Sequence, residues 1–492
     1  MMKPATAIID ACGDPALFAR WFRDAETWLA WFAFLRALFG LSMSGEDLEL
    51  FQQCTGREAP PVGGTRECWL VCGRRAGKSF ILALVAIFLA CFCDWLPYLS
   101  PGERGTVMVV AADKKQARVI YRYAAALLRE VPMLKALISR DTAEAIDLTN
   151  SVTIEILTAS FRTVRGYTLI AALCDEIAFW RSDESANPDN EIIGAIRPAM
   201  ATIPGAMLLC ASSPYARRGA LWTAFRKFFG EDGPVLVWKA DTRTMNPTVP
   251  QSVIDEAYEN DPASAAAEYG AEFRTDVETY INREAVDACT IAGRYELPPA
   301  SNVSYVAFLD PSGGSSDSMT LAIAYRDKDG RSILSAVRER RPPFSPEAVV
   351  SEFADLLKAY GVRKVVGDRW GGEFVREPFR SRGIQYELAE KPKSDIYRDL
   401  LPLVNSGKVE LLDHPRLVGQ LCGLERRTAR SGKDSIDHGP GAHDDLCNAA
   451  AGALVAAGGR PAIDWAAVGP RLIAQSRANP YRRPPFRERQ RF

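Results

Sequence analysis

The chain has 492 residues, 47% hydrophobic and 25% charged, a composition typical of a globular protein with two or three domains. A net charge of −1 excludes nucleic-acid binding through the field of the whole chain, so such binding requires local basic patches. The apolar run 80–93 is too short to cross a membrane and no signal segment precedes the first motif, so we expect no membrane association. Among the 11 cysteines several lie in apolar runs, which predicts reduced, buried thiols and a cytoplasmic protein.

Residues 1–44 are rich in aromatic side chains near helical spacing, which predicts a helical N-terminal extension. Ser44 is a candidate cap for a following helix that carries Gln52. A glutamine shortly before a phosphate-binding loop can bind an adenine edge through paired hydrogen bonds. Gln52 is therefore a candidate nucleotide contact, and a plain surface position is the alternative.

The segment 68–79, CWLVCGRRAGKS, has the layout of a phosphate-binding loop. A short apolar strand, 69–71, precedes the loop and an apolar helix, 80–93, follows it. The predicted loop consists of Gly73, Arg74, Arg75, Ala76 and Gly77, and it leads into Lys78 and Ser79. Backbone N–H groups of such a loop and the start of the helix attract a phosphate. We expect Lys78 to contact the outer phosphates of ATP and Ser79 to ligate Mg²⁺, although Cys72 replaces the first glycine of the usual pattern.

Strands and helices alternate after the loop, which predicts a mainly parallel sheet covered on both faces. The strands are expected at 107–111, 152–157, 169–174, 207–210 and 235–238, with a helix at 114–130. In such sheets ligands bind at the carboxyl ends of the strands. Asp175-Glu176 and Ser212-Ser213 follow two of these strands, as the phosphate-binding loop follows the first.

Asp175 and Glu176 complete a predicted ATPase site, with a P-loop ATPase domain over 45–275. The first carboxylate would hold Mg²⁺, and the second would orient and deprotonate the attacking water. Ser212-Ser213 is a candidate sensor of the outer phosphate, with a plain turn as the alternative. Arg74, Arg75 and Arg165 compete for the role of stabilising transition-state charge.

A polar segment with two prolines, 276–300, predicts a linker, and a second domain is expected over 301–460. Three strands with short turns (305–309, 319–325 and 332–337) predict an antiparallel meander, followed by a helix at 346–360 and a strand at 365–367. A final helix starts near His443. This order is ribonuclease-H-like.

That fold places carboxylates on its first strand, at the end of its fourth strand and on its final helix. Asp310, Asp368 and Asp445 occupy these places, with Asp444 competing with Asp445 for the third. Asn448 is one helical turn from Asp445 and is a candidate weak ligand or supporting residue. Such carboxylates predict phosphodiester hydrolysis with two Mg²⁺ or Mn²⁺ ions.

The chain resembles the large subunit of tailed-phage terminase, a DNA-packaging motor, over roughly 45–460. The matching segments are CGRRAGKS, LCDEIAFW, ASSP, LDPSGG, VVGDRWGG and GAHDDLCNAAAGA, in that order. The resemblance implies ATP-driven translocation of double-stranded DNA into a procapsid and metal-dependent endonuclease cutting of concatemeric DNA. It assigns Lys78, Ser79, Asp175 and Glu176 to the ATPase, Ser212-Ser213 to coupling, and Asp310, Asp368 and Asp445 to the nuclease. It also implies a portal protein and a small terminase subunit as partners, a pentameric ring on the portal, and a place in the cytoplasm of an infected or lysogenic bacterial host but not in the mature particle.

Basic segments are candidate DNA contacts in this interpretation. One contains Arg426, Arg427, Arg430 and Lys433, another contains Lys391 and Lys393, and a solvated surface is the alternative for both. The tail, 461–492, holds seven arginines and one glutamate after position 470, which predicts disorder and docking on an acidic partner such as the portal, or on DNA. Two other classes remain open: a helicase-like or remodelling ATPase with an accessory nuclease, and a degenerate prophage protein with weak nuclease activity.

Overall fold

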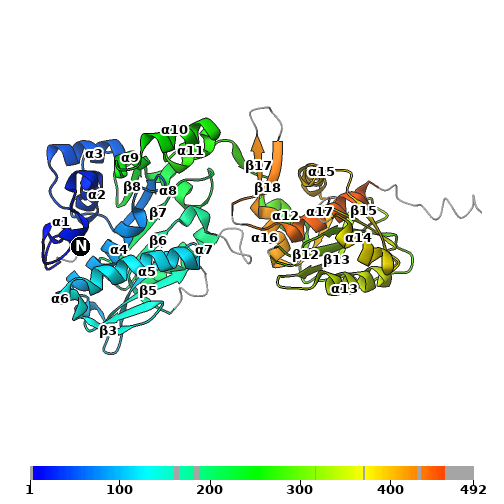
Figure 1. The fold of residues 1–492 in the computed structure, drawn as a ribbon, viewed down its shortest axis with the longest axis horizontal. Coiled ribbons are helices and arrows are strands. Elements are labelled where there is room, and N and C mark those ends of the chain that lie inside the picture. Colours follow the sequence, from blue (N-terminus) through cyan, green and yellow to red (C-terminus); the bar gives the residue numbers. More distant parts are fainter. Residues whose placement is uncertain are drawn as a thin grey trace, which may run out of the picture. The chain divides into compact units, whose positions relative to one another are not determined.

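The computed structural model describes residues 4–159, 166–180, 188–315, 317–368, 372–428, 434–440 and 442–459. These residues form two compact units (Figure 1). The first unit comprises the described parts of Met1–Thr279, Glu425–Ser435 and Gly439–Ala442. The second comprises those of Tyr280–Leu424, Ile436–His438 and the chain from His443 onward. The predicted tail, 461–492, and Arg165 lie outside the described residues.

The first unit contains an eight-stranded sheet in the order β3-β4-β5-β2-β6-β7-β1-β8. Six of its strands are parallel, in agreement with the sequence: β1 (Glu67–Cys72), β2 (Gly105–Ala111), β5 (Val152–Thr158), β6 (Thr168–Asp175), β7 (Met207–Ser212) and β8 (Val235–Ala240). Two antiparallel strands, β3 (Ile138–Asp141) and β4 (Ala145–Leu148), extend one edge. The carboxyl ends of β6, β7 and β1 are therefore adjacent.

Side chains of the central strands alternate between two cores because successive residues of a strand point to opposite faces. On one face Cys68, Leu70 and Cys72 of β1 belong to a core that also contains side chains of five helices: α1 (Ile8–Gly13), α2 (Leu29–Phe39), α3 (Gly45–Thr55), α4 (Lys78–Phe92) and α5 (Lys114–Arg129). On the other face Trp69 and Val71 meet α7 (Pro188–Met200) and α8 (Gly219–Phe228). Covering both faces accounts for the continuous apolar runs of these strands.

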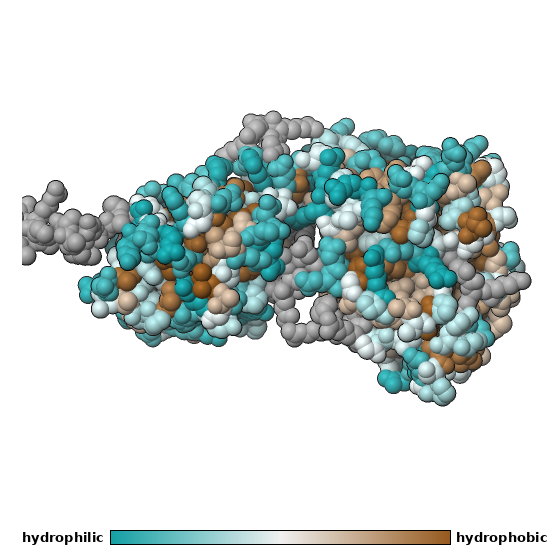
Figure 2. All heavy atoms as spheres, turned by 180° about the vertical axis from the view of Figure 1, so that it is seen from behind, coloured by the Kyte–Doolittle hydropathy of each residue, from teal (hydrophilic) through white to brown (hydrophobic). Residues whose placement is uncertain are grey.

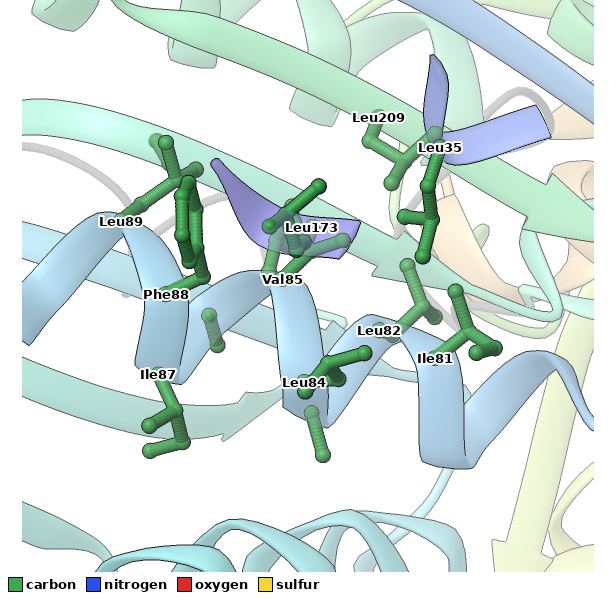
Figure 3. Packing of buried hydrophobic residues seen from close by; sticks show 14 of the residues in the cluster. Leu35, Ile81, Leu82, Leu84, Val85, Ile87, Phe88, Leu89, Leu173 and Leu209 are labelled. Atoms are coloured by element: carbon green, nitrogen blue, oxygen red, sulfur yellow. The ribbon is translucent and has the colours of Figure 1, made fainter. Parts of the chain in front are cut away.

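Helix α4 follows the phosphate-binding loop and is apolar on nearly all sides because it is enclosed on nearly all sides. Its Leu82 and Val85 lie in one cluster with Leu173 of β6, Leu209 of β7 and Leu35 of α2 (Figure 3). Side chains of the segment 8–43 thus belong to the main core of the first unit, and they position α4 as well as covering it.

The remaining elements of the first unit are short and support its edges. They are η1 (Ala19–Trp21), η2 (Ala25–Trp28), η3 (Leu96–Tyr98), α6 (Pro132–Lys135), η4 (Ile177–Phe179), α9 (Thr242–Met245), α10 (Gln251–Asn260) and α11 (Pro262–Glu268). A small sheet, of which Leu424 and Ile436–His438 belong to the second unit, has the order β18-β17-β9 and is formed by β9 (Val277–Thr279), β17 (Leu424–Thr428) and β18 (Asp434–His438). Of these, α9 directly follows β8 and becomes important for the phosphate-binding loop.

The second unit contains a seven-stranded sheet in the order β10-β16-β13-β12-β11-β14-β15. Its strands are β10 (Thr290–Ile291), β11 (Tyr305–Asp310), β12 (Met319–Arg326), β13 (Ser332–Arg340), β14 (Lys364–Gly367), β15 (Gln385–Leu388) and β16 (Val409–Leu412). The first three long strands, β11, β12 and β13, are antiparallel, and β14 and β15 continue parallel to β11. This is the ribonuclease-H-like order that the sequence predicted.

Helices cover both faces of this sheet. One face carries α12 (Arg283–Cys289), α15 (Lys393–Asn405), α16 (Pro415–Gly423) and α17 (Asp445–Gly458), and the other carries α13 (Pro346–Ala359) and α14 (Gly372–Ser381). The segment 276–300, expected to be a linker, contains α12 and buries Val286 in the second unit. Its polar composition reflects the solvent-facing side of a short amphipathic helix.

No helix among the described residues is long and apolar enough to span a membrane. On the face drawn in Figure 2, hydrophobic side chains occur in small groups between hydrophilic ones.

Helix α17 lies close to strand β11 because Gly452 faces the ring of Phe308. A Cβ atom at Gly452 would lie 2.2 Å from that ring, so Gly452→Ala should force the helix away and destabilise the second unit by about 1–3 kcal/mol. Thermal unfolding measures the loss. The matched control is Gly423→Ala in α16, where a Cβ meets no atom within 4 Å. Equal stability of the two variants would contradict this account of the packing.

Candidate ATPase and nuclease sites

The predicted phosphate-binding loop connects the end of β1 to the start of α4. Two of its residues have left-handed backbone angles: Gly77, with φ of 102°, and Arg75, with φ of 66°. Only glycine adopts this region without cost, so Arg75 is held there by its surroundings. Gly73 is required for a different reason, since a Cβ atom there would lie 2.2 Å from the hydroxyl oxygen of Thr242.

Lys78 is buried at the mouth of this loop. Its ammonium group donates to the carbonyl oxygens of Cys72 and Gly73, each at 3.1 Å, and to Ser213 Oγ at 3.0 Å. Glu176 lies 3.5 Å from the same nitrogen. The lysine thus connects the loop to the ends of β6 and β7.

Ser79 and Asp175 meet as the sequence predicted. The Ser79 hydroxyl donates to Asp175 Oδ2 at 3.0 Å, while the other carboxylate oxygen, Oδ1, is buried with no hydrogen-bond partner among the described residues. Burial raises the pKa of Asp175 to about 7, and the neighbouring Glu176 adds to the rise, against the effect of Lys78. A buried carboxylate with a spare oxygen beside a serine hydroxyl is a set of donors that fits Mg²⁺.

Glu176 follows directly, with a left-handed backbone φ of 50° that turns its side chain toward β7. Its Oε2 atom accepts from the Ser212 hydroxyl and from the Ser213 N–H, both at 3.1 Å. Because Ser213 also contacts Lys78, one strand end joins the residue expected to bind phosphate and the residue expected to activate water.

The other predicted nucleotide contacts are placed differently. The side chains of Arg74 and Arg75 are both exposed, and Arg74 forms an ion pair with Glu268 at 3.0 Å. Ala76 is buried within the loop. Gln52 lies at the exposed side of α3 and donates to the Glu58 carbonyl at 2.9 Å, and no described hydrogen bond joins it to the loop.

A second group of polar residues lies at the end of β11 in the second unit. Asp310 is the last residue of β11, and Asp368 follows β14. The two strands are parallel neighbours with Leu309 opposite Gly367, so the aspartates leave the sheet side by side. The N–H of Asp368 donates to the Leu309 carbonyl at 3.2 Å and fixes this register.

Helix α17 packs on the sheet beside β11 and contributes Asp445 and Asn448 to this group. The Asn448 side chain donates from Nδ2 to Asp310 Oδ2 at 2.8 Å. The residues enclose a cavity of about 260 Å³. It is lined by Asp310, Pro311, Ser312, Asp317, Asp368, Lys393, His438, His443, Asp444, Asp445 and Asn448.

Asp444 and Asp445 have different surroundings although they are adjacent. Asp444 Oδ2 accepts from the Tyr397 hydroxyl and lies beside Lys393 Nζ, both at 2.9 Å. Asp445 Oδ2 and Asn448 Oδ1 are buried without a hydrogen-bond partner in the described part of the chain. Two unsatisfied buried oxygens facing a carboxylate-lined cavity fit a divalent cation, which favours Asp445 over Asp444 as the third ligand.

Five aspartates line this cavity, and the lysine of the lining, Lys393, contacts one of them, Asp444. Burial raises the pKa of Asp310 well above its usual range, against the hydrogen bond from Asn448, and the carboxylate of Asp445 adds to the rise. Burial also raises the pKa of Asp445, with Asp444 next in effect. Both carboxylates therefore gain from a bound cation.

Sequence reasoning missed Asp317 and the pairing of Lys393. Asp317 belongs to the loop after β11, and its Oδ1 lies 3.8 Å from His443 Nδ1. Lys393 lies between Asp437, at 2.8 Å, and Asp444, so burial, which would lower its pKa, is more than offset by these carboxylates and the pKa rises. Asp317 follows Asp310 closely in the sequence, which could have indicated that both belong to one site. The sequence around Lys393 does not predict its partners, because Asp437 and Asp444 are distant in the chain.

Asp437, His438 and Asp444 also bring ligand atoms within 4.8 Å of one another. The ammonium group of Lys393 already contacts both carboxylates, so an internal cation occupies the position a metal would take.

The predicted basic segments are partly paired. Arg426 pairs with Asp434, Arg427 lies 3.2 Å from Glu425, and Lys391 lies 2.6 Å from Asp399. Arg430 and Lys433 lie outside the described residues.

No family model matches the chain, and no curated protein matches it. Several solved structures do. The large terminase of bacteriophage HK97 is 18% identical, with 80% of this chain and 91% of that chain covered and a TM-score of 0.35. A large terminase from a thermophilic bacteriophage is 13% identical, with coverages of 83% and 98% and a TM-score of 0.35. The large terminase nuclease of the thermophilic phage G20c with bound magnesium is 19% identical, with coverages of 35% and 94% and a TM-score of 0.30.

These similar structures come from the family whose motifs the sequence resembles. Because every identity is below 20% and every TM-score below 0.5, we derive the function from the two sites themselves.

The different surroundings of Asp444 and Asp445 lead to opposite effects of removing their charge. Asp445→Asn removes a carboxylate that burial and Asp444 disfavour, so the metal-free protein should unfold about 2–4 °C higher. The same change should abolish the stabilisation by Mn²⁺. Asp444→Asn deprives Lys393 of a partner and should lower the unfolding temperature while leaving the response to Mn²⁺. Thermal unfolding with and without Mn²⁺ measures both, and the reverse pattern would assign the ligand to Asp444.

Proposed function

We propose that this chain is a terminase large subunit, which uses ATP to drive double-stranded DNA into a procapsid and cuts concatemeric DNA with a metal-dependent nuclease. The observation that carries the proposal is the presence of both sites in one chain. Lys78, Ser79, Asp175 and Glu176 gather at adjacent strand ends of the first unit. Carboxylates gather at the end of β11 in a ribonuclease-H-like second unit.

In the ATPase site, the loop N–H groups and Lys78 bind the phosphates, and Ser79 and Asp175 would hold Mg²⁺. When bound, Mg²⁺ would neutralise charge that develops on the transferred phosphate. Glu176 orients the attacking water and accepts its proton. Ser212 and Ser213 hold the Glu176 carboxylate in place for this step, since they donate to its Oε2 atom.

Ser213 gives the site a means of coupling. Its hydroxyl contacts Lys78, and its N–H contacts Glu176. When the Lys78 ammonium group turns to a phosphate oxygen, it loses its hydrogen bond to the Ser213 hydroxyl, which follows β7. The presence or absence of the outer phosphate therefore changes the contacts of Ser213. The exposed Arg75, and not the paired Arg74, is the residue of the loop available to stabilise transition-state charge.

In the nuclease site, Asp310, Asp368 and Asp445 would hold divalent cations. Two such ions would supply an activated water and stabilise the leaving oxygen of a phosphodiester. Asn448 fixes the rotamer of Asp310 through its amide N–H, and Lys393 and Tyr397 hold Asp444, which starts the helix that presents Asp445.

The partners in this proposal are double-stranded DNA, a portal protein, a small terminase subunit and further copies of the chain in a pentameric ring on the portal. DNA packaging would take place in the cytoplasm of an infected or lysogenic bacterial host. The basic segments and the arginine-rich tail supply charge for DNA or an acidic partner.

The proposed function makes a prediction about Glu176. Glu176→Gln keeps an oxygen that accepts from Ser212 and Ser213 but removes the base, so ATP hydrolysis should fall by about 10²-fold or more while nucleotide binding remains. DNA-stimulated phosphate release and ADP binding measure the two effects. Glu272→Gln, which alters a surface partner of Lys239, is the matched control. Near-normal turnover of the Glu176 variant would contradict its role as base.

The proposed function also predicts that the two activities separate. Asp310→Asn removes a charge from the metal-binding cavity, so plasmid cleavage should fall by orders of magnitude while ATP hydrolysis remains. Lys78→Ala should abolish ATP turnover and packaging but leave cleavage in Mg²⁺ or Mn²⁺. Phosphate release and supercoiled-plasmid nicking on the same preparations measure both.

Asp329→Asn, in an exposed turn, is the control for the nuclease variant. Parental cleavage by Asp310→Asn would rule out the nuclease site, and loss of both activities in both folded variants would rule out their separation. Stimulation of ATP turnover by empty procapsids would distinguish a packaging motor from a helicase-like ATPase, which would unwind strands instead.

A further inference from the structure

Three consecutive carbonyl groups of the phosphate-binding loop are each held from outside the loop by a different side chain. The Thr242 hydroxyl donates to the Arg74 carbonyl at 2.8 Å. The Asn246 amide donates to the Arg75 carbonyl at 2.8 Å. The indole N–H of Trp31 donates to the Ala76 carbonyl at 2.9 Å. We call Trp31, Thr242 and Asn246 the loop anchors.

Anchoring a carbonyl also fixes a backbone N–H group. In a trans peptide the C=O and the N–H of the next residue point in opposite directions. The anchors on residues 74, 75 and 76 therefore turn the N–H groups of Arg75, Ala76 and Gly77 away from the anchors. Successive N–H groups held in this way form an anion-binding concavity.

The anchors are themselves firmly placed. Trp31 is 1% exposed in α2, and Thr242 is fully buried at the start of α9. Asp241 caps α9 by accepting from the N–H groups of Arg243 and Thr244. Asn246 ends the same helix, and its Oδ1 accepts from the Thr248 hydroxyl at 2.6 Å, which leaves its NH₂ group facing the loop. Helices α2 and α9 contact each other, so the anchors belong to one wall.

Two features of the loop depend on this wall. Arg75 adopts a left-handed backbone that is unfavourable for arginine, and Asn246 binds the carbonyl of that same residue. Gly73 has no room for a Cβ atom because Thr242 packs against it. Both observations indicate that α9 keeps the loop in one conformation.

We propose that Trp31, Thr242 and Asn246 are positioning residues that hold the phosphate-binding loop in its anion-binding conformation before a nucleotide arrives. The inference rests on the proposed ATPase function of the same loop and adds how its affinity for nucleoside phosphates is set. A loop that is already ordered loses little conformational freedom on binding, so the anchors increase affinity without touching the nucleotide.

Removing one anchor should weaken nucleotide binding more than it slows the chemical step. Thr242→Val keeps the shape but removes the hydroxyl, and Trp31→Phe keeps an aromatic ring but removes the N–H. Each, like Asn246→Ala, should raise the Kd for Mg²⁺-ADP and for a non-hydrolysable ATP analogue by about threefold to tenfold. The KM for ATP should rise in parallel while kcat changes less. Thr242→Ser should restore the parental Kd because it restores the donor.

Two matched controls separate anchoring from general structural damage. Thr244→Val removes a hydroxyl of the same helix that donates to Asp241, at 2.7 Å, and not to the loop. Trp95→Phe removes a buried indole N–H that donates to the Leu89 carbonyl at the far end of α4, at 2.8 Å. Both should keep the parental Kd.

Hydrogen exchange in the nucleotide-free protein tests the loop directly. In the parent the anchors should make opening of the loop rare, so the amides of residues 75–77 should exchange slowly. Their exchange should be about tenfold faster in Thr242→Val and in Asn246→Ala, because the loop then opens more often. Parental Kd together with parental exchange in Thr242→Val would overturn the proposal. If the parent bound no nucleotide at all, the proposed ATPase function would fail, whereas faster exchange of the loop amides in the two variants would still support the anchors.

Discussion

A buried ammonium group, that of Lys78, joins the phosphate-binding loop to the residues that follow β6 and β7 in the candidate ATPase site. A charge that leaves water is tolerated only when it is paired and hydrogen-bonded, and Lys78 finds its partners at three strand ends. The carbonyl groups of Cys72 and Gly73 end β1, Glu176 follows β6, and Ser213 follows β7. The strand order β6-β7-β1 is what makes these contacts simultaneous. The apolar helix α4 is then needed to hold Lys78 at the sheet, since the lysine is its first residue.

The second unit has the opposite electrostatic character. There the sheet and α17 bring carboxylates together, and the nearby ammonium group of Lys393 is taken up by Asp437 and Asp444. Asp310 receives the neutral amide of Asn448, and one oxygen of Asp445 has no hydrogen-bond partner within the described ranges. A bound divalent cation would recover the cost of keeping these oxygens out of water, so the same burial that destabilises the metal-free fold would favour the loaded one. Asn448 is neutral, so it supports Asp310 without adding to the repulsion between the carboxylates.

Much of the fold and of the two sites can be predicted from the sequence, because it depends on residues that are close to one another in the chain. Apolar runs of strand length that end in Asp175-Glu176, Ser212-Ser213 and Asp368 give both the sheets and the polar residues at their ends. The choice between Asp444 and Asp445 does not follow, because it depends on Tyr397 and Lys393, which are 47 and 51 residues before Asp444 in the chain. The anchors of the phosphate-binding loop were invisible for the same reason, since Thr242 and Asn246 are 168 and 171 residues from the carbonyls they hold. Propensity and spacing report contacts within an element, and these contacts join elements that only the finished fold brings together.

The departure of the loop from the usual pattern has an explanation in the same contacts. Cys72 stands where a first glycine is expected, yet it is the last residue of β1, pairs with Ala240 of β8 and is completely buried, so a side chain is accommodated and even fills the core there. The next residue, Gly73, is the one at which the backbone meets α9, and a Cβ atom would collide with Thr242. The requirement for glycine is therefore set by what packs against the loop and not by the phosphate alone. In this chain the packing element is α9: its Thr242 leaves no room for a Cβ atom at Gly73, whereas the side chain of Cys72, one position earlier, is accommodated in the core.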